Sequence, residues 1–323
     1  MDDTNDIKSF EQFYTTRLQP LIDNLKKEAG SAGDWGIIAP ATVVLAILVF
    51  VGYQAGFIHG NAGLAILLCI VAVAGSIFFF TKKNDRYTKD YKETIIKEII
   101  TFLHPGITYK PDEVIAKPEY KFSGLFRRKF DYYDGDDYME GVYKNVPFRC
   151  SELHTQYERL TVSSIVGSRT ITIFKGLFFV ADINKNFAAG TYIWPHGHEQ
   201  VGSNIADERY RLLPSANIFK VKLQQAVPGF EDFFSVYSTD PDEAGRIITR
   251  TMAERLVKFK LQVKREIAVS FVAGKCYVAI SIKENLLEPS GYDTDDREDM
   301  KKYFFTVLLV LSIVNQLHLN ELV

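Results

Sequence analysis

The first hundred residues contain one long apolar stretch between amphipathic segments. From Trp35 to Thr81 the chain carries no Lys, Arg, Asp or Glu side chain. As a single helix this stretch would be about 70 Å long, more than twice the roughly 30 Å hydrocarbon core of a bilayer. Gly60 and Asn61, near its middle, favour a turn. The pattern therefore predicts a transmembrane helical hairpin over residues 35–80.

The hairpin divides into two predicted spans, at about 35–57 and 63–80. The alternative is a buried helical hairpin of a soluble protein. Such a hairpin normally keeps charged positions that face water, and this one has none. The pattern favours the membrane, so membrane lipids are the first expected partner of the chain.

The basic residues around the hairpin predict its orientation. The loop 58–62 between the spans carries no Lys or Arg, whereas both flanks do. The flanking bases are Lys8, Arg17, Lys26 and Lys27 before the hairpin and Lys82, Lys83, Arg86, Lys89 and Lys92 after it. Because basic flanks stay on the cytoplasmic side, we expect both termini in the cytoplasm. Cys69, Cys150 and Cys276 are then expected as reduced thiols.

Two amphipathic helices are predicted beside the hairpin, one within residues 1–34 and one over 82–105. In both segments apolar residues recur at steps of three and four. They are Ile7, Phe10, Tyr14, Leu18, Leu21 and Leu25 in the first helix, and Tyr87, Tyr91, Ile95, Ile99 and Phe102 in the second. Pro20 predicts a kink in the first helix. The two stripes favour a paired stalk, although the first helix can instead lie on the bilayer surface.

Residues 111–323 predict an α+β cytoplasmic domain that is rich in strands. Alternating apolar positions bounded by turn residues predict the strands Tyr138–Tyr143, Val146–Tyr157, Thr170–Ala181, Thr191–Trp194, Ile218–Leu223, Phe233–Tyr237, Ile267–Phe271 and Cys276–Ile282. A helix is expected from Asp240, which can act as its N-cap, to about Lys260. In the closing helix, at about 295–317, the apolar run Tyr303–Val314 is too short to span a bilayer and predicts a core helix.

Composition and charge narrow the classes of function. The chain has 323 residues, 47% of them apolar, and a net charge of −2 at pH 7. These values exclude an intrinsically disordered chain and disfavour a nucleic-acid-binding protein, which is usually strongly basic. The sequence contains no GxxxxGK[ST] phosphate loop, no HExxH and no GxSxG motif. No cofactor is therefore predicted.

The best metal-binding candidate lies in the segment Trp194–Glu199. His196 and His198 are separated by one glycine, so both imidazoles can reach one ion, and Glu199 can add a carboxylate oxygen. A zinc site usually needs a third or fourth ligand, which the sequence does not locate. The alternative is a solvated loop that carries two histidines, which is the commoner arrangement.

Four aspartates, Asp131, Asp134, Asp136 and Asp137, surround a turn at Gly135. Paired carboxylates of this kind can act as a general acid and a general base. More often such a cluster belongs to a solvated loop. The solvated loop is the interpretation that the sequence favours.

Arg127, Arg128 and Lys129 stand between aromatic residues in the segment Phe122–Phe130. Bases beside aromatic rings can contact anionic lipid headgroups, each contributing about 1 kcal/mol near the membrane surface. The alternative is a short turn that buries its phenylalanines in the domain while its bases face water. No wider basic field surrounds the segment, so nucleic acid is not an expected partner.

Several segments of the second half are similar to those of a known family. They are Phe174–Phe179, followed by Asp182, Asn184, Lys185 and Phe187, then Phe234–Ser238, and the hairpin Val269–Ile280. Together with the two-span anchor, they resemble the bacterial family catalogued as domain of unknown function 3137. The resemblance implies a bacterial inner-membrane protein without an assigned activity, cofactor or catalytic residue. It also implies an envelope-associated partner, because such proteins are often encoded beside LemA-type membrane proteins.

The sequence favours a non-catalytic inner-membrane protein whose cytoplasmic domain acts as a partner- or ligand-binding scaffold. The anchor without Lys, Arg, Asp or Glu residues, the stalk and the absence of catalytic motifs support this expectation. A membrane-tethered metal-dependent hydrolase that uses His196, His198 and Glu199 is the main alternative. A conducting or transporting assembly is the third, but pumps and channels normally place ionisable residues inside the membrane.

Overall fold

The computed structural model forms two compact units. It describes residues 3–29, 31–56, 62–159, 169–185, 187–198, 218–223, 227–289 and 296–322. The units are Met1–Ile99 with Glu288–Phe304, and Ile100–Leu287 with Phe305–Val323. The predicted boundary between the stalk and the α+β domain, near residues 105–111, lies close to the first of these divisions. Residues 288–304 belong to the first unit.

The N-terminal helical segment of the first unit contains one irregular turn. Its elements are α1 (Asp3–Phe13), a π-helical turn (Tyr14–Leu18) and α2 (Gln19–Ala29). The Gln19 N–H donates to the Tyr14 carbonyl, five residues earlier. Pro20, for which the sequence predicted a kink, follows directly and has no N–H to donate. The irregularity observed beside this proline is thus a widened turn.

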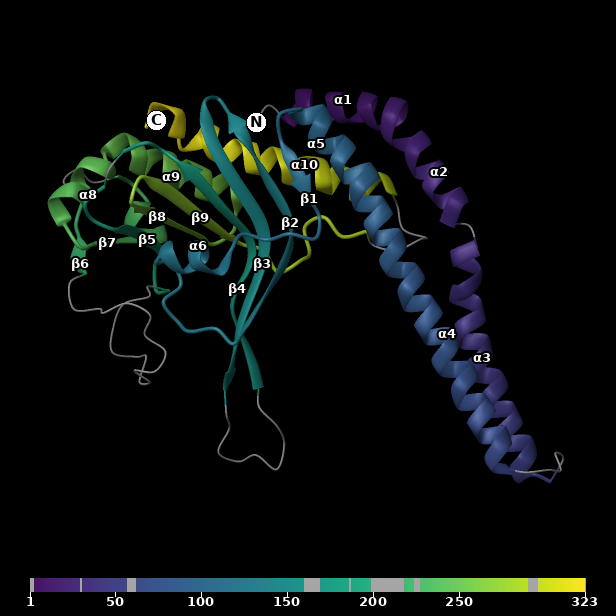
Figure 1. Cartoon of the computed structure of the whole chain (residues 1–323). Helices are drawn as coiled ribbons and strands as arrows, with labels where there is room; N and C mark the ends of the chain where they lie inside the picture. The colour runs from purple at the N-terminus through teal and green to yellow at the C-terminus, as the bar shows by residue number, and fades with distance from the viewer. Residues whose placement is uncertain are drawn as a thin grey trace. The chain divides into compact units, whose positions relative to one another are not determined.

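Helices α3 (Ser31–Gln54) and α4 (Ala62–Tyr91) lie side by side and run in opposite directions (Figure 1). The hydroxyls of Thr42 and Ser76 form a hydrogen bond of 2.9 Å between them. Large apolar side chains on both helices are exposed, among them Val44, Leu45, Leu48, Val51, Leu67, Ile70, Val71, Ile77 and Phe78. Soluble proteins rarely expose so much contiguous apolar surface.

In the described part of the chain, one helix is long and apolar enough to cross a membrane by length and composition. It is Arg297–Glu321, and more than half of its apolar window is buried inside the protein. Ile313 and Val314 are fully buried, as in the core helix of a folded domain. The apolar helical stretches Pro40–Gln54 and Cys69–Phe78 are shorter. The pair of membrane spans therefore stays a prediction.

Helix α4 continues beyond the apolar stretch. It is followed by a π-helical turn at Lys92–Ile96 and by α5 (Lys97–Leu103). Ile95, Ile96 and Ile99 on this segment are completely buried. The helical run that the sequence predicted after the hairpin is therefore present. Its apolar stripe is buried from Tyr87 to Ile99, whereas Phe102 is 45% exposed.

The amphipathic helices of the first unit also pack on a third helix, α10 (Asp296–Gln316). The ring centroids of Phe10 and Phe304 are 5.4 Å apart, and those of Tyr91 and Tyr303 are 6.4 Å apart. The sequence predicted that the two stripes would cover each other. Aromatic side chains of α10 contribute to covering both of them.

The second unit is built on one antiparallel sheet (Figure 1). Its strands are β1 (Thr108–Lys110), β2 (Tyr132–Tyr143), β3 (Val146–Arg159), β4 (Arg169–Asp182), β5 (Thr191–Pro195), β6 (Phe219–Val221), β7 (Phe234–Ser238), β8 (Ile267–Val272) and β9 (Lys275–Ser281). The strand order is β1-β2-β3-β4-β9-β8-β5-β7-β6, and all the pairs are antiparallel. The predicted strand-rich α+β fold class is confirmed, whereas β1 was not predicted.

Two tight turns join strands that the sequence predicted as neighbours along the chain. Lys144 and Asn145, between β2 and β3, have φ angles of 49° and 66°. Ala273 and Gly274, between β8 and β9, have φ angles of 48° and 75°. Positive φ at both central residues defines a type I′ turn, whose twist matches that of paired strands. Both predicted hairpins are confirmed.

The single helix predicted from Asp240 to Lys260 is wrong. The chain forms two helices there, α8 (Pro241–Ile247) and α9 (Arg250–Val263). Ile248 has φ −91° and ψ 67°, which is not helical, so α8 ends at this residue. The other described helical segments of this unit are α6 (Lys117–Phe122), α7 (Phe230–Phe233) and a closing 3₁₀ turn (Leu319–Glu321).

Each of these two helices has its own N-cap. The Asp240 carboxylate accepts hydrogen bonds from the N–H groups of Asp242 and Glu243, at 2.9 and 3.2 Å. The Thr249 hydroxyl accepts one from the Met252 N–H at 3.3 Å. The predicted cap at Asp240 is confirmed. The second cap allows α9 to begin at Arg250, directly after α8 ends.

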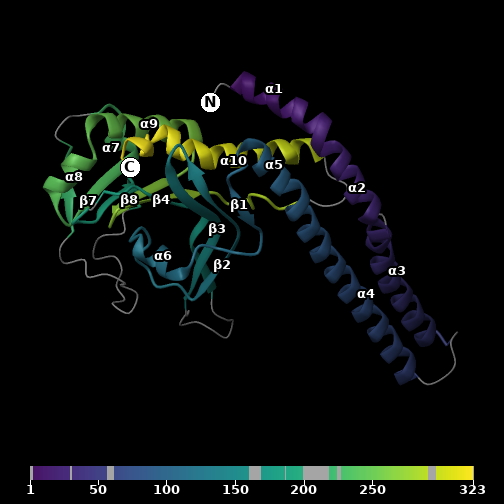
Figure 2. The same ribbon diagram turned by 45° about the horizontal axis from the view of Figure 1, so that its top comes forward.

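Helices cover both faces of the sheet. Figures 1 and 2 show α6 against one face and α9 with the C-terminal part of α10 against the other. Tyr120, Phe178 and Trp194 belong to the core on the α6 face and are at most 1% exposed. Phe179 points to the opposite face, because side chains alternate along a strand, and it is also fully buried. Central strands such as β4 are therefore apolar on both faces.

Gly176 in β4 is expected to tolerate no side chain. Its φ is 144°, and an added Cβ would lie 2.2 Å from the carbonyl oxygen of Ile280 in β9. Because this oxygen belongs to the sheet backbone, Gly176→Ala should lower the free energy of unfolding by about 3 kcal/mol or more. Thermal unfolding of the full chain measures the loss.

Gly229→Ala is the matched control. Gly229 also has a positive φ, of 78°, but the nearest atom to an added Cβ, on Phe233, is 3.8 Å away. Only the backbone strain remains, so the expected loss is about 1 kcal/mol. Equal losses for the two variants would contradict the close approach of β4 and β9.

Candidate functional site

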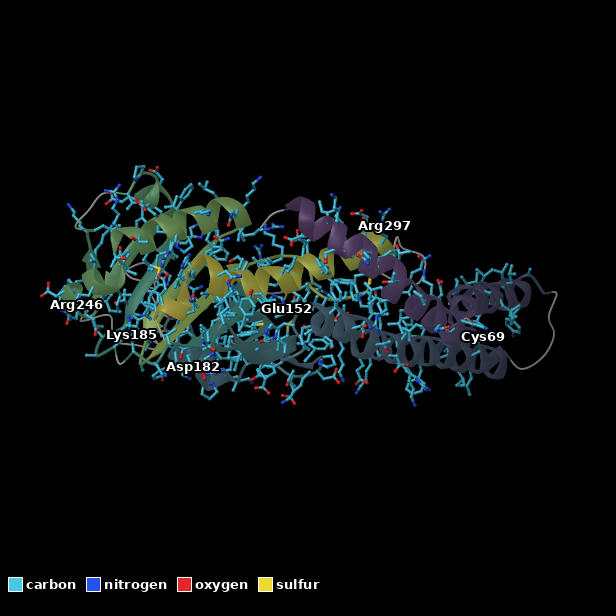
Figure 3. All side chains as sticks on the ribbon, turned by 90° about the horizontal axis from the view of Figure 1, so that it is seen from above. Cys69, Glu152, Asp182, Lys185, Arg246 and Arg297 are labelled. Atoms are coloured by element: carbon cyan, nitrogen blue, oxygen red, sulfur yellow. The ribbon has the colours of Figure 1, made fainter. Side chains whose placement is uncertain are left out.

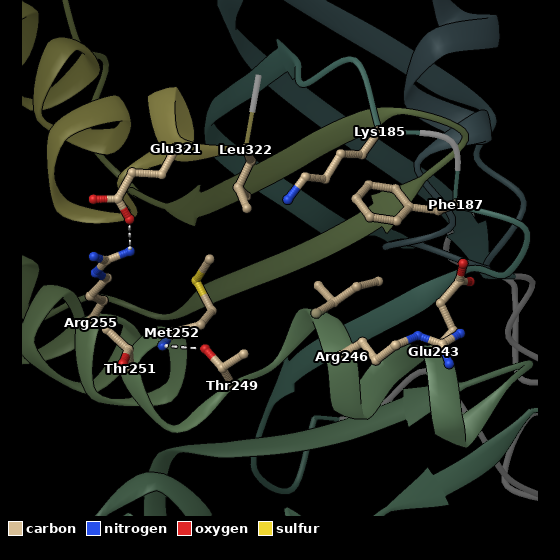
Figure 4. Close-up of a pocket in the computed structure, with 11 residues that line it drawn as sticks. Lys185, Phe187, Glu243, Arg246, Thr249, Thr251, Met252, Arg255, Glu321 and Leu322 are labelled. Atoms are coloured by element: carbon tan, nitrogen blue, oxygen red, sulfur yellow. Dashed lines mark hydrogen bonds and ion pairs between the residues drawn. The ribbon is translucent and has the colours of Figure 1, made fainter.

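A cavity of about 590 Å³ opens in the second unit beside α8 and α9 (Figure 4). Its charged residues are Lys185 from the β4–β5 connection, Glu243 and Arg246 from α8, Arg255 from α9 and Glu321 from the closing 3₁₀ turn. Ligand pockets of proteins commonly have volumes of about 300–1,000 Å³. The cavity is therefore large enough for a small organic molecule.

Both carboxylates of the cavity already have partners. Glu243 accepts hydrogen bonds from the N–H groups of Ala188 and Ala189, at 3.0 and 2.7 Å. These bonds hold the β4–β5 connection against α8. Glu321 forms an ion pair of 3.0 Å with Arg255, drawn as a dashed line in Figure 4. Both carboxylates are therefore bonded to other groups of the protein.

Unlike the two carboxylates, two of the three cations have no side-chain partner among the described residues. Lys185 and Arg246 are exposed and have no ion pair or hydrogen bond with another side chain among the described residues. Figure 3 shows both at the same end of the second unit, and Figure 4 shows the Lys185 ammonium extending over the cavity. Three cations and two carboxylates line the cavity, which leaves an excess of positive charge.

The remaining surface of the cavity is largely apolar. Phe187, Ile247, Met252 and Leu322 contribute side chains to it. Met252 is 4% exposed, and the Phe187 ring meets the buried Phe271 ring edge to face, with centroids 5.9 Å apart. The described lining contains no Ser, Cys or His side chain that could act as a nucleophile or as a general base at neutral pH.

A separate ionic network on the α6 face connects α6 to the sheet. The Glu119 carboxylate accepts hydrogen bonds from the Lys275 ammonium at 3.0 Å and from the Tyr277 hydroxyl at 2.9 Å. The Arg149 guanidinium donates to Glu119 and to Asp182, each at 3.1 Å. Burial raises the pKa of the Glu119 carboxyl, but the bonds from Lys275 and Tyr277 outweigh it, so this pKa lies below its ordinary value.

A cluster of three carboxylates lies on β2 and β3. Ligand oxygens of Asp136, Asp137 and Glu152 are all within 4.8 Å of one another. Hard divalent cations prefer such oxygen ligands, so this group in the described part of the chain can hold one. Its buried members also have structural bonds. The Tyr109 hydroxyl donates to Asp137 at 2.5 Å, and the Leu286 N–H donates to Glu152 at 2.7 Å.

The interpretation of the aspartates Asp131, Asp134, Asp136 and Asp137 as a solvated loop is wrong for Asp137, whereas Asp131 and Asp134 are exposed to solvent. The last three belong to β2, and Asp137 is only 2% exposed. Asp137 has a φ of 59° and lies at a bulge in the pairing of β2 with β3. A bulge can redirect a side chain from solvent into the protein. The sequence pattern does not show it, because acidic residues normally indicate solvent.

His196 and His198, the predicted metal ligands, have different neighbours. His196 Nδ1 is 3.4 Å from the Ser235 hydroxyl, and His198 Nδ1 is 3.5 Å from the Glu266 carboxylate. Glu199 lies outside the described residues. Among those that are described, no group of three metal-binding side chains includes either histidine. The metal site stays a prediction.

Arg127, Arg128 and Lys129, the predicted lipid contacts, lie in three different environments. Arg127 is 4% exposed, and Lys129 is exposed to solvent. The Arg128 guanidinium stacks over the Tyr157 ring, 4.2 Å from its centroid. The three bases therefore do not form one exposed patch, because the Arg127 side chain is enclosed. Contact with anionic lipid stays a prediction for Arg128 and Lys129.

Sequence reasoning did not find the cavity. Lys185, Arg246 and Glu321 are far apart in the chain and belong to no motif. The cap at Asp240 located the start of α8, but nothing in the sequence placed this helix beside the β4–β5 connection. The sheet does so, because β5 pairs with both β7 and β8. The segment before β5 thereby meets the helices that follow β7.

Comparison with known proteins identifies a family and a distant structural match. The family model described as "Protein of unknown function (DUF3137)" matches residues 172–319, a little under half of the chain. No curated protein matches the chain. A matching solved structure is that of the mycobacterial trehalose monomycolate transport factor A, TtfA, with 12% identity and a TM-score of 0.32 over 69% of this chain and 93% of that one. At this score the likeness carries no argument.

Glu119→Gln should remove part of the acid dependence of stability. The pKa of Glu119 in the folded chain lies below its ordinary value of 4.5. Its stabilising contribution is therefore complete above about pH 4.5 and is lost as the pH falls through the lowered pKa. Stability of the natural chain should decrease over this range, and the uncharged variant should show a smaller decrease. Thermal unfolding between about pH 3 and 7 measures both.

Glu113→Gln is the control for this experiment. Glu113 forms an ion pair of 3.0 Å with Lys110 in which both side chains are exposed. Exposed pairs contribute little to stability, so this variant should keep the natural pH profile. An unchanged profile for Glu119→Gln would show that the network does not stabilise the ionised carboxylate.

Proposed function

We propose that this chain, which over residues 172–319 belongs to the DUF3137 family of proteins of unknown function, is a membrane-anchored binding protein. Helices α3 and α4 would form the anchor, and the sheet-containing unit would bind a ligand or a partner without transforming it. The anchor would lie in a bacterial inner membrane. An envelope membrane protein of the LemA type is a proposed partner.

The exposed apolar surface of α3 and α4 is the observation that carries the proposal. Leu45, Leu48 and Val71 are each about 60% exposed, although their side chains have no polar group. Each buried square ångström of such surface is worth about 25 cal/mol, so leaving the hairpin in water would be costly. Between Trp35 and Thr81 no charged side chain offsets this cost. A bilayer removes it.

The details of the proposed anchor follow from its flanks and its interior. The spans would cover about 35–57 and 63–80, with both basic flanks and both termini in the cytoplasm. The two polar side chains between the helices have partners. Ser76 bonds to Thr42 at 2.9 Å and donates to the Ala72 carbonyl at 2.6 Å. A hydroxyl in the hydrocarbon core of a bilayer finds no water, so it must be hydrogen-bonded within the protein, as these are.

The binding role rests on the cavity beside α8 and α9. Its two carboxylates are bonded within the protein, two of its cations have no such partner among the described residues, and its described lining contains no Ser, Cys or His side chain. Neither the hydrolase nor the transport alternative has comparable support. His196 and His198 have different partners, and the hairpin contains no Lys, Arg, Asp or Glu side chain that could relay ions.

Two arginines on the exposed side of α3 should release the chain from the membrane. The natural chain should remain in the pellet after a carbonate wash. Val44→Arg with Leu48→Arg places charges where each costs about 2.5–3.5 kcal/mol in a bilayer centre, so this variant should appear in the supernatant or fail to insert. Immunoblotting of both fractions gives the distribution.

Phe122→Arg provides the control. Phe122 is 55% exposed but belongs to α6 in the second unit, so an arginine there should leave the chain in the pellet. Release of the natural chain by carbonate would refute the anchor.

Peptide tags should report the orientation. A tag on either terminus should be protected from an impermeant label in intact cells and become labelled after the cells are opened, because the basic flanks stay in the cytoplasm. Labelling of either tag in intact cells would contradict the proposed orientation.

A further inference from the structure

We propose that the cavity beside α8 and α9 binds a small amphiphilic anion, with a phosphate or carboxylate head and an apolar body. This inference rests on the proposed binding function and specifies its ligand class. Lys185 and Arg246 would hold the head, and the apolar wall around Met252 would receive the body.

The charge of the cavity selects the sign of the ligand. Glu243 bonds to two backbone N–H groups, and Glu321 is paired with Arg255. These contacts leave Lys185 and Arg246 without an acid in the described part of the chain. A cationic ligand would find no uncommitted carboxylate. An anion would find two charged donors, and charge-assisted hydrogen bonds are the strongest that side chains form.

The start of α9 adds to this preference. Thr251 and Met252 of its first turn line the cavity, and this turn contains no acidic residue. The first N–H groups of a helix carry partial positive charge, which favours an anion nearby. The first turn of α8 differs, because Asp242 and Glu243 already supply negative charge there.

The apolar wall selects against a bare inorganic ion. Phe187, Ile247 and Leu322 line the cavity together with Met252. A volume of about 590 Å³ exceeds what one phosphate or carboxylate group needs and matches a small organic molecule. Apolar atoms on the ligand would replace water against these side chains and gain about 25 cal/mol per square ångström buried.

Phenyl phosphate is the probe of choice, because it joins a dianionic head to a ring and is soluble in water. The full chain, reconstituted in phosphatidylcholine nanodiscs, is titrated by calorimetry against empty nanodiscs. Saturable binding is expected, tighter than that of inorganic phosphate, which lacks the ring, and of phenol, which lacks the charge. Binding of phenol as tight as that of phenyl phosphate, or no saturable binding of the probe, would overturn the inference.

Single charge removals locate the site. Lys185→Met and Arg246→Met should each weaken phenyl phosphate binding roughly ten- to hundredfold, as expected when a hydrogen bond to a charged group is lost. Lys283→Met is the matched control, because Lys283 is also exposed and does not line the cavity. Unchanged affinity in both cavity variants would place the anion elsewhere and overturn the inference.

A lipid headgroup and a soluble metabolite can both supply this chemistry. Replacing part of the phosphatidylcholine with phosphatidylglycerol distinguishes them. A lower apparent affinity for phenyl phosphate, absent in Lys185→Met, would identify the anionic headgroup as the occupant. An unchanged affinity in the natural chain would identify a soluble anion. Both results support an anion site.

The same samples separate failure of this inference from failure of the proposed function. Retention in the carbonate pellet is measured for the natural chain and for each variant. A chain that stays in the pellet but binds no probe would refute only the ligand class. A chain that leaves the pellet would refute the anchor, whatever it binds.

Discussion

The uncharged hairpin of α3 and α4 imposes the strongest physical constraint on this protein. Its outward side chains are apolar and exposed. Contact of this surface with water is unfavourable, so an apolar environment is expected to cover it. Several neighbouring features suit a bilayer in that role. The bases stand on both flanks and are absent from the intervening loop, and the two hydroxyls between the helices bond to each other. A soluble helical pair would need none of these features.

The constraint on the second unit is different, because both faces of its wide sheet must be buried. Apolar residues alternate between the α6 face and the α9 face, and the close approach of Gly176 to Ile280 depends on the absence of a side chain. Several of the polar groups inside are paired. Glu119 holds α6 against two strands, and the carboxylates of Asp137 and Glu152 accept structural hydrogen bonds. Such satisfied groups specify one packing arrangement of the sheet.

The charge that the cavity offers to a ligand depends on which of its polar groups are already bonded within the protein. A carboxylate that binds backbone N–H groups, as Glu243 does, contributes to the fold and is withdrawn from ligand recognition. Lys185, by contrast, has no ion pair or side-chain hydrogen bond with the residues that the structure describes, so its ammonium is available to an anionic ligand. The difference between these two residues, both charged and both polar in sequence, lies entirely in which neighbours the fold provides. It is this difference that turns a surface hollow into a candidate anion site.

The sequence by itself determined the local elements, because periodicity, turn residues and caps act over a few positions. The apolar hairpin segment, the positions of the turns at Lys144-Asn145 and Ala273-Gly274 and the Asp240 cap could be predicted in this way. Only the tertiary structure decided that Asp137 and Arg127 are buried and that Lys185 and Arg246 line the same cavity. The burial of Asp137 depends on a bulge, and the cavity depends on the strand order, which brings together residues remote in the chain; neither leaves a local pattern in the sequence.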